Sequence, residues 1–214
     1  SGKSLLLYLI SMYLLRQGSR GLLIVPRSAL VEQMFSDFQD YSTKNGKDMF
    51  KYCWRVYSGR DKDSEHPIII STWQSLQRMP KEYFQKFDYV ICDEVHQAQA
   101  KALSDIVTKC TNAKYRIGVT GTLSGAKAHE WVLMGLFGSI YRATTSAELM
   151  EKKQLAELTI KCLLLKYSEE ECSYMKHASY QEEIEYIVSN KTRNKFICNL
   201  ALSLEGNTLL LFNY

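Results

Sequence analysis

The stretch YVICDEVH (Tyr89–His96) decides the fold of this chain. Its first residues are apolar and β-favouring, and they run directly into two adjacent carboxylates, which predicts a buried strand that ends in an acidic loop. Two charges placed against an apolar run cost free energy unless a partner offsets them. The stretch therefore predicts a binding site at the strand end or, as the simpler alternative, a strand followed by the solvated start of a helix.

Short apolar runs alternate with helical segments through the first two thirds of the chain. This alternation predicts an α/β fold, with a parallel, doubly wound sheet flanked by helices. Functional residues in such sheets gather at the carboxyl ends of the strands. Besides the acidic strand, we expect strands at Gly21–Val25, Cys53–Tyr57, Ile68–Ser71 and Tyr115–Val119, and helices at Leu5–Arg16, from Ser28 to about Tyr41, and at Ala98–Cys110.

The pattern changes after about Trp131, and we expect a domain boundary within Ala143–Glu157. The prediction is a first domain at residues 1–148, followed by a linker and the beginning of a second domain at residues 149–214. In the second part we expect strands at Leu158–Tyr167 and Thr208–Phe212, and helices at Tyr180–Val188 and Thr192–Leu204.

The composition is that of an ordinary globular chain, with 46% hydrophobic and 23% charged residues among 214. A net charge of +4 permits a nucleic-acid partner without arguing for one. Six scattered cysteines without metal-ligand spacing favour a reducing cytosol. No apolar run reaches transmembrane length, and no signal peptide is expected. Because the sequence lacks an initiator Met, we expect a fragment.

The sequence Ser1-Gly2-Lys3-Ser4 at a helix start matches the end of the phosphate-binding pattern G-x-x-x-x-G-K-[ST]. In that pattern glycine lets backbone N–H groups approach phosphate oxygens, lysine reaches the β- and γ-phosphates, and serine meets Mg²⁺. The match is partial, and a capped helix is the simpler alternative. A strand that ends in Asp-Glu 90 positions later favours a phosphate-binding site over a capped helix. Together the two motifs predict nucleotide hydrolysis.

The chain resembles the superfamily 2 helicases and translocases of the DEAH-like type. Ser1–Ser4 resembles motif I, Asp93–His96 motif II and Thr120–Thr122 motif III. Pro26–Leu30 and Ser71–Gln74 resemble motif Ia and the threonine-containing motif before the acidic strand. The resemblance spans nearly the whole chain and is strongest to a phage group. It implies a RecA-like domain lacking its first strand, followed by the truncated start of a second RecA-like domain.

The resemblance also implies roles in ATP hydrolysis. Lys3 would bind the β- and γ-phosphates, and Ser4 and Asp93 would hold Mg²⁺. Glu94 would orient or deprotonate the attacking water, a task suited to a carboxylate. The expected catalytic residues are thus Glu94, Asp93 and Lys3, and the expected nucleotide-binding residues are Ser1, Gly2, Lys3 and Ser4.

Two further groups are implied. One would couple the phosphate site to the second domain, although its histidine could be an ordinary loop residue; it consists of His96, Thr120, Gly121 and Thr122. The other would bind DNA phosphates without reading sequence. Its tryptophan could stack on a base, but core packing is favoured; it consists of Arg27, Ser28, Thr72, Trp73 and Gln74.

These features predict an ATP-dependent DNA helicase or translocase that remodels branched DNA, including forks and recombination intermediates, in the cytoplasm of a phage-infected bacterium. The fragment is expected to be inactive alone, since the later motifs, including an arginine finger, are missing. Three alternatives stay open: the motor subunit of a restriction enzyme, an RNA helicase, and an ATP-dependent annealing or clamp factor that does not unwind.

Overall fold

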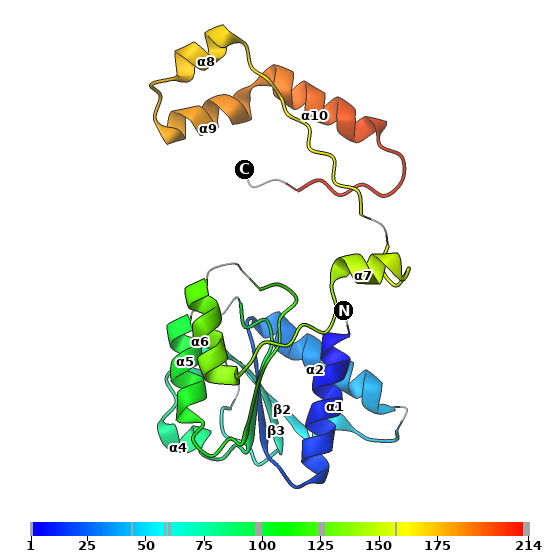
Figure 1. Cartoon of the computed structure of the whole chain (residues 1–214), viewed down its shortest axis with the longest axis vertical. Helices are drawn as coiled ribbons and strands as arrows, with labels where there is room; N and C mark the ends of the chain where they lie inside the picture. The colour runs from blue at the N-terminus through cyan, green and yellow to red at the C-terminus, as the bar shows by residue number, and fades with distance from the viewer. Residues whose placement is uncertain are drawn as a thin grey trace. The chain divides into compact units, whose positions relative to one another are not determined.

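The computed structural model describes residues 2–43, 45–57, 59, 61–96, 100–123, 127–156 and 158–211. Their contacts divide the chain into two units, residues 1–143 and 144–214. In the first unit a five-stranded sheet carries helices on both faces (Figure 1). Its elements are α1 (Lys3–Arg16), β1 (Gly21–Val25), α2 (Ser28–Thr43), the 3₁₀ turn η1 (Met49–Lys51), β2 (Cys53–Val56), β3 (Ile68–Thr72), α3 (Trp73–Leu76), α4 (Lys81–Phe84), β4 (Tyr89–Cys92), α5 (Ala100–Lys109), β5 (Tyr115–Gly118) and α6 (Lys127–Phe137).

The sheet has the order β2-β3-β1-β4-β5, and all of its pairings are parallel. Strand β1 is central and buried along its whole length, as its unbroken apolar sequence GLLIV predicts for a strand covered on both faces. The expected α/β fold is confirmed. Because parallel strands end at the same edge, the segments that follow β1, β3, β4 and β5 meet there.

Alternate side chains of β1 enter two separate cores. Leu23 and Val25 pack with apolar residues of α1 and α2, whereas Leu22 and Ile24 pack with residues of α3, α4, α5 and α6. Figure 1 shows α1 and α2 together and α4, α5 and α6 on the opposite side of the strands. This layering fixes α1 and α2 beside each other, next to the edge where the strands end.

Gly21 at the start of β1 is required by a close contact with β4. Gly21 is in register with Tyr89, and a Cβ at position 21 would overlap the Tyr89 ring. The ring is fully buried, so it has no free space into which to move. The glycine therefore allows an aromatic side chain to fill the core beneath the acidic strand.

The described residues of the second unit form helices joined by irregular segments. No residue of α8, α9 or α10 is buried, and serine–glutamate capping boxes begin α8 and α9. The two helices expected near its end are confirmed. The helices are α7 (Ser146–Glu151), α8 (Glu169–Met175), α9 (Tyr180–Ser189) and α10 (Lys191–Ser203).

The strands expected in this unit are wrong for the residues described. Residues 158–167 and 208–211 are irregular, and Phe212 lies outside the described residues. Ile160 and Leu164 expose 76% and 88% of their surface. Their β-favouring sequence does not form a strand because a strand needs a neighbouring strand to pair its backbone groups. Among the described helices none combines the length and apolarity needed to cross a membrane.

Candidate active site

Two carboxylates follow the carboxyl end of β4. The Asp93 N–H donates to the carbonyl oxygen of Ile24 on β1 at 2.8 Å, so the pairing of the two strands continues to the first acidic residue. The Glu94 N–H donates to Asp93 Oδ1 at 2.9 Å. Glu94 has a φ of 49°, in the left-handed region that residues with a Cβ rarely adopt. The chain turns sharply at Glu94 and gives the two carboxylates different surroundings.

Glu94 forms an ion pair with Lys3, which lies 91 residues earlier at the start of α1. The side chains of Lys3 and Glu94 are 21% and 22% exposed. A Cβ at Gly121 would lie 3.3 Å from Lys3 Nζ, so the loop after β5 approaches the lysine closely. The start of α1, which carries Lys3, therefore meets the loops after β4 and β5.

A cavity of about 130 Å³ adjoins this ion pair. Lys3, Ser4 and Asp93 form one part of its wall, and α2 supplies the rest through Leu30, Gln33, Met34 and Asp37. Gly2, just before α1, has a φ of 70° and no side chain to cap the first N–H groups of the helix. The cavity thus combines a helix N-terminus, an ammonium group, a hydroxyl and a carboxylate, which is a set suited to a phosphate with its cation.

The two adjacent carboxyl groups have pKa values shifted in opposite directions. Burial raises the pKa of Asp93, and the charge of Lys3 offsets only part of that shift. Burial also acts to raise the pKa of Glu94, but the hydrogen bond and charge of Lys3 outweigh it and lower the pKa. For Asp93 the Lys3 charge and the hydrogen bond from the Glu94 N–H do not outweigh burial, whereas for Glu94 the interactions with Lys3 do.

His96 connects the loops after β4 and β5. Its Nδ1 lies 2.5 Å from Thr120 Oγ1 and 3.3 Å from Glu94 Oε2. The Thr120 hydroxyl donates to the carbonyl oxygen of Thr122 at 2.7 Å, which uses its one hydrogen. If the Thr120 hydrogen is directed to Thr122, the hydrogen shared between His96 and Thr120 is carried by His96 Nδ1. The histidine is a bridge between the Glu94 carboxylate and the loop after β5.

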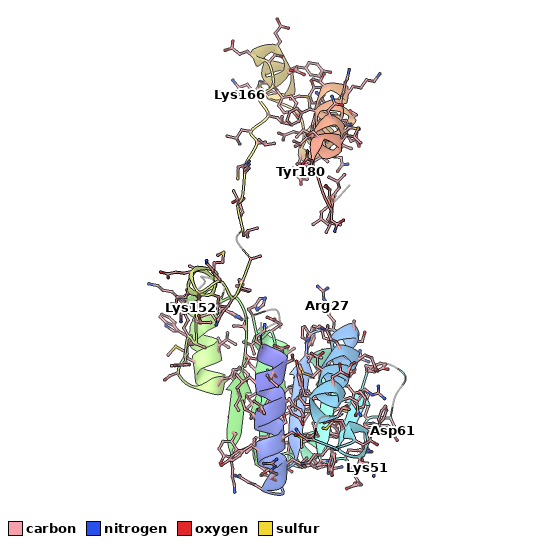
Figure 2. The ribbon with its side chains drawn as sticks, turned by 90° about the vertical axis from the view of Figure 1, so that its right-hand side faces the viewer. Arg27, Lys51, Asp61, Lys152, Lys166 and Tyr180 are labelled. Atoms are coloured by element: carbon pink, nitrogen blue, oxygen red, sulfur yellow. The ribbon has the colours of Figure 1, made fainter. Side chains whose placement is uncertain are left out.

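The expected DNA-binding residues lie at the ends of β1 and β3, which are neighbours in the sheet. Arg27 and Ser28 are exposed, and Figure 2 shows the Arg27 side chain projecting away from the ribbon. Gln74 is also exposed, and its Nε2 donates to the carbonyl oxygen of Pro26 at 3.3 Å. This bond ties the two segments into one polar surface.

The other two residues of this group are less available. Thr72 is buried and its side chain caps α3 by accepting from the Ser75 N–H. Trp73 is partly buried against the core beneath α3, α4, α5 and α6. Both side chains thus make contacts within the fold. For Trp73 this agrees with the expectation that core packing is favoured over stacking on a base.

Ser1 lies outside the described residues, whereas Lys3, Ser4, Asp93, Glu94 and the His96–Thr120 bridge are gathered at the strand ends. Sequence reasoning missed the contribution of α2, which lines the cavity through Gln33 and Asp37 and whose Tyr41 bonds to Ser4. The sequence offers little indication of a role for Tyr41, because this residue lies at an apolar position of the helical repeat.

The donor set fits Mg²⁺. The ion prefers oxygen ligands and is commonly held by one or two carboxylates together with substrate phosphates and waters. Asp93 and Ser4 supply a carboxylate and a hydroxyl in the same cavity, and burial raises the pKa of Asp93 in a way that a cation would oppose. In the part of the chain that the structure describes, no three acidic, histidine or cysteine residues form a closed metal cage.

Comparison with known structures places this architecture in a class. The solved structure of UvsW from bacteriophage T4 aligns with 94% of this chain and 39% of its own, with a TM-score of 0.59 and 32% identity. The parallel sheet and its strand-end loops are thus those of a RecA-like domain of the superfamily 2 helicases. The chain belongs to the family described as "Type III restriction enzyme, res subunit", whose model matches residues 1–125.

Two relatives are helicases by description. The ATP-dependent DNA helicase uvsW of Enterobacteria phage T4 is 34% identical over the whole of this chain, which spans 43% of that protein. The ATP-dependent DNA helicase Hel308 of Pyrococcus horikoshii is 27% identical over 66% of this chain and 21% of its own length. The chain therefore spans less than half of the relatives it matches.

Proposed function

We propose that this chain carries the ATP-hydrolysing site of an ATP-dependent DNA helicase or translocase. The observation that carries the proposal is the Lys3–Glu94 ion pair beside the cavity that Ser4 and Asp93 line. Four groups from distant parts of the chain would act there on one phosphate chain and one water. The helicase relatives support this choice of activity.

Phosphate binding would begin at the start of α1, where the N–H groups and the helix dipole favour an anion. Lys3 would exchange Glu94 for the β- and γ-phosphates of ATP. Glu94, which then loses the cation that lowers its pKa, becomes a better acceptor for the proton of an attacking water. Ser4 and Asp93 would hold Mg²⁺, whose charge stabilises the phosphate oxygens during transfer.

His96 would report the state of Glu94 to the loop after β5. When Glu94 changes partner, the Nδ1 contact at 3.3 Å and the Thr120 bond at 2.5 Å must adjust together. Gly121 and Thr122 belong to the same loop and would move with it. We propose that this bridge couples hydrolysis to the motion that drives DNA, which is an expectation from the resemblance to motifs II and III.

The exposed surface of Arg27, Ser28 and Gln74 would hold the DNA backbone through hydrogen bonds without reading its sequence, with Thr72 and Trp73 positioning it. The relative described as an ATP-dependent DNA helicase of a phage supports DNA as the substrate and a bacterial host as the location, for which we propose the cytoplasm. That the DNA is branched is our proposal from the resemblance described in the sequence analysis. Residues 149–214 would be the linker and the beginning of a second RecA-like domain. We expect the 214 residues on their own to hydrolyse ATP poorly or not at all, since they span 43% of that relative.

The test is ATP turnover by the full-length protein without nucleic acid and with single-stranded DNA, forked DNA or matched RNA. We expect the strongest stimulation with forked DNA, and a loss of at least 100-fold in turnover in Glu94→Gln with ATP binding retained. Stimulation by RNA alone would favour an RNA helicase, and turnover indifferent to nucleic acid would contradict a motor.

A second function is favoured by the family description, because the matched family is named for a restriction enzyme subunit. In that case the same ATP site would drive a nuclease complex. ATP-dependent cleavage of duplex DNA by the full-length protein with its partners would select this function, and branch movement without cleavage would exclude it.

A further inference from the structure

The hydroxyl of Ser4 is held by a tyrosine from another helix. Ser4 Oγ lies 2.9 Å from Tyr41 Oη, and either atom can donate the hydrogen. Among the described residues, Tyr41 is the hydrogen-bond partner of this hydroxyl. The bond joins the first turn of α1 to the last turn of α2, which are 37 residues apart in sequence.

The ring of Tyr41 is held in place by aromatic packing. It lies 5.6 Å from the ring of Tyr8, which in turn makes an edge contact with Phe38 at 5.4 Å. Tyr8 and Phe38 are buried, at 4% and 0% exposure. Because these rings belong to the core between α1 and α2, the position of the Tyr41 hydroxyl is set by the fold rather than by the free side chain.

The face of α2 that carries Tyr41 also forms the wall of the cavity. Asp37 lies one turn before Tyr41, and Met34 lies one turn earlier on the same face. Both line the cavity with Ser4 and Asp93. Tyr41 therefore contacts Ser4 from the side of the cavity wall, not from a separate part of the surface.

A hydroxyl that binds a cation must direct a lone pair to the metal and its hydrogen elsewhere. Serine has one hydrogen and two lone pairs, and it rotates freely unless a partner fixes it. The Tyr41 oxygen, at 2.9 Å, can accept that hydrogen. With the hydrogen directed to Tyr41, a lone pair of Ser4 Oγ is left for the cavity that contains Asp93.

We propose that Tyr41 is a positioning residue for the Mg²⁺ ligand Ser4. The proposal rests on the proposed function, in which Ser4 and Asp93 hold the cation. Tyr41 does not touch the metal or the nucleotide in this assignment. It acts through Ser4, as the outer partners of metal ligands do when they fix ligand orientation.

The test measures binding of fluorescent mant-ADP to the full-length protein as a function of Mg²⁺ concentration, and of Mn²⁺ by electron paramagnetic resonance. In Tyr41→Phe, which keeps the ring and loses the hydroxyl, we expect about 10-fold more metal at half-saturation. Binding of mant-ADP without metal should not change. Tyr8→Phe is the matched control, because it removes a hydroxyl from the same aromatic cluster without touching Ser4, and it should behave as wild type.

A double-mutant cycle separates positioning from packing. If Tyr41 acts through Ser4, adding Tyr41→Phe to Ser4→Ala should cause no further change in metal dependence. Unchanged metal dependence in Tyr41→Phe, an equal shift in Tyr8→Phe, or additive effects in the cycle would each overturn the proposal. Lys3→Ala tests the underlying function separately: if it binds mant-ADP as wild type does, the nucleotide site itself is wrong, and the role of Tyr41 fails with it.

Discussion

Asp93 and Glu94 are adjacent in sequence but differ in what compensates their charge. Glu94 has the Lys3 ammonium group, which lowers its pKa despite burial, whereas burial dominates for Asp93 and raises its pKa. Two carboxyl groups whose pKa values are shifted in opposite directions are typical of sites that divide two tasks between two acids. In the proposed function Asp93 would bind the metal and Glu94 would accept the proton of the attacking water.

Asp93→Asn should make the metal-free protein more stable at pH 7. The folded-state pKa of Asp93 is raised, so its ionised form opposes folding, and this cost grows as pH rises from the ordinary carboxyl value through the raised one. Asparagine removes the cost while its amide oxygen can still accept the Glu94 N–H. We expect a melting temperature a few degrees higher at pH 7 and little difference near pH 3, measured by calorimetry.

Glu94→Gln serves as the control for that measurement, because it should lower the melting temperature at pH 7 where Asp93→Asn should raise it. Glu94 has a lowered pKa, so its ion pair stabilises the fold above the ordinary carboxyl value, and that contribution is lost as pH falls through the lowered one. The loss at pH 7 should be about 1 kcal/mol or less for a partly exposed pair. A lower melting temperature for Asp93→Asn at pH 7 would contradict the burial argument.

At the scale of elements, the sheet was predictable because its strands are short apolar runs bounded by turns. The segment at residues 158–167 was not, although its residues are equally β-favouring. The difference is pairing, since GLLIV lies between β3 and β4 and residues 158–167 lie in no sheet of the described chain. A high β-propensity allows a segment to form a strand, but the strand forms only where a neighbouring strand pairs with it.

Gly21→Ala should destabilise the first unit by about 1–3 kcal/mol, because the new methyl group overlaps the buried Tyr89 ring. The free energy of unfolding is measured by chemical denaturation. Tyr89→Leu supplies the matched background: once the ring is gone, Gly21→Ala should cost much less. Equal costs in both backgrounds would show that the contact between β1 and β4 is not the cause.

Thr120→Val should weaken the link between the loops after β4 and β5. It removes the hydroxyl that lies 2.5 Å from His96 Nδ1 but keeps the shape of the side chain. In the full-length protein we expect at least 5-fold weaker stimulation of ATP turnover by DNA, with basal turnover little changed. Thr111→Val, at an exposed turn, is the control. Loss of basal turnover instead would assign Thr120 to the hydrolysis step.

At the scale of the whole molecule, the two units differ in how much they bury. The first contains both cores, whereas α8, α9 and α10 contain no buried residue. Hydrogen exchange on the 214-residue chain should therefore protect β1 and β4 amides most and leave α8–α10 amides exchanging faster by several orders of magnitude. Comparable protection of α10 and β1 would contradict this assignment.

The sequence predicted that Lys3 and Glu94 lie together, but it did not predict their geometry, and the roles of both residues in hydrolysis stay a prediction. Motif chemistry placed Lys3 and Glu94 in one site although 91 positions separate them. It could not show that they pair directly, since that depends on the packing of α1 beside β4. Tyr41 was missed for a related reason. A tyrosine in an apolar repeat predicts a buried ring, and where its hydroxyl points depends on how α2 lies against α1.

The left-handed backbone at Glu94 has a consequence for protein engineering. A backbone with φ at 49° suits glycine or asparagine better than glutamate. Among variants that all lose the Lys3 ion pair, selection for heat tolerance without a demand for turnover should therefore favour Glu94→Gly and Glu94→Asn over Glu94→Gln. Such variants would relieve the backbone strain and lose the proposed water-activating group, so their recovery would show what the glutamate costs the fold.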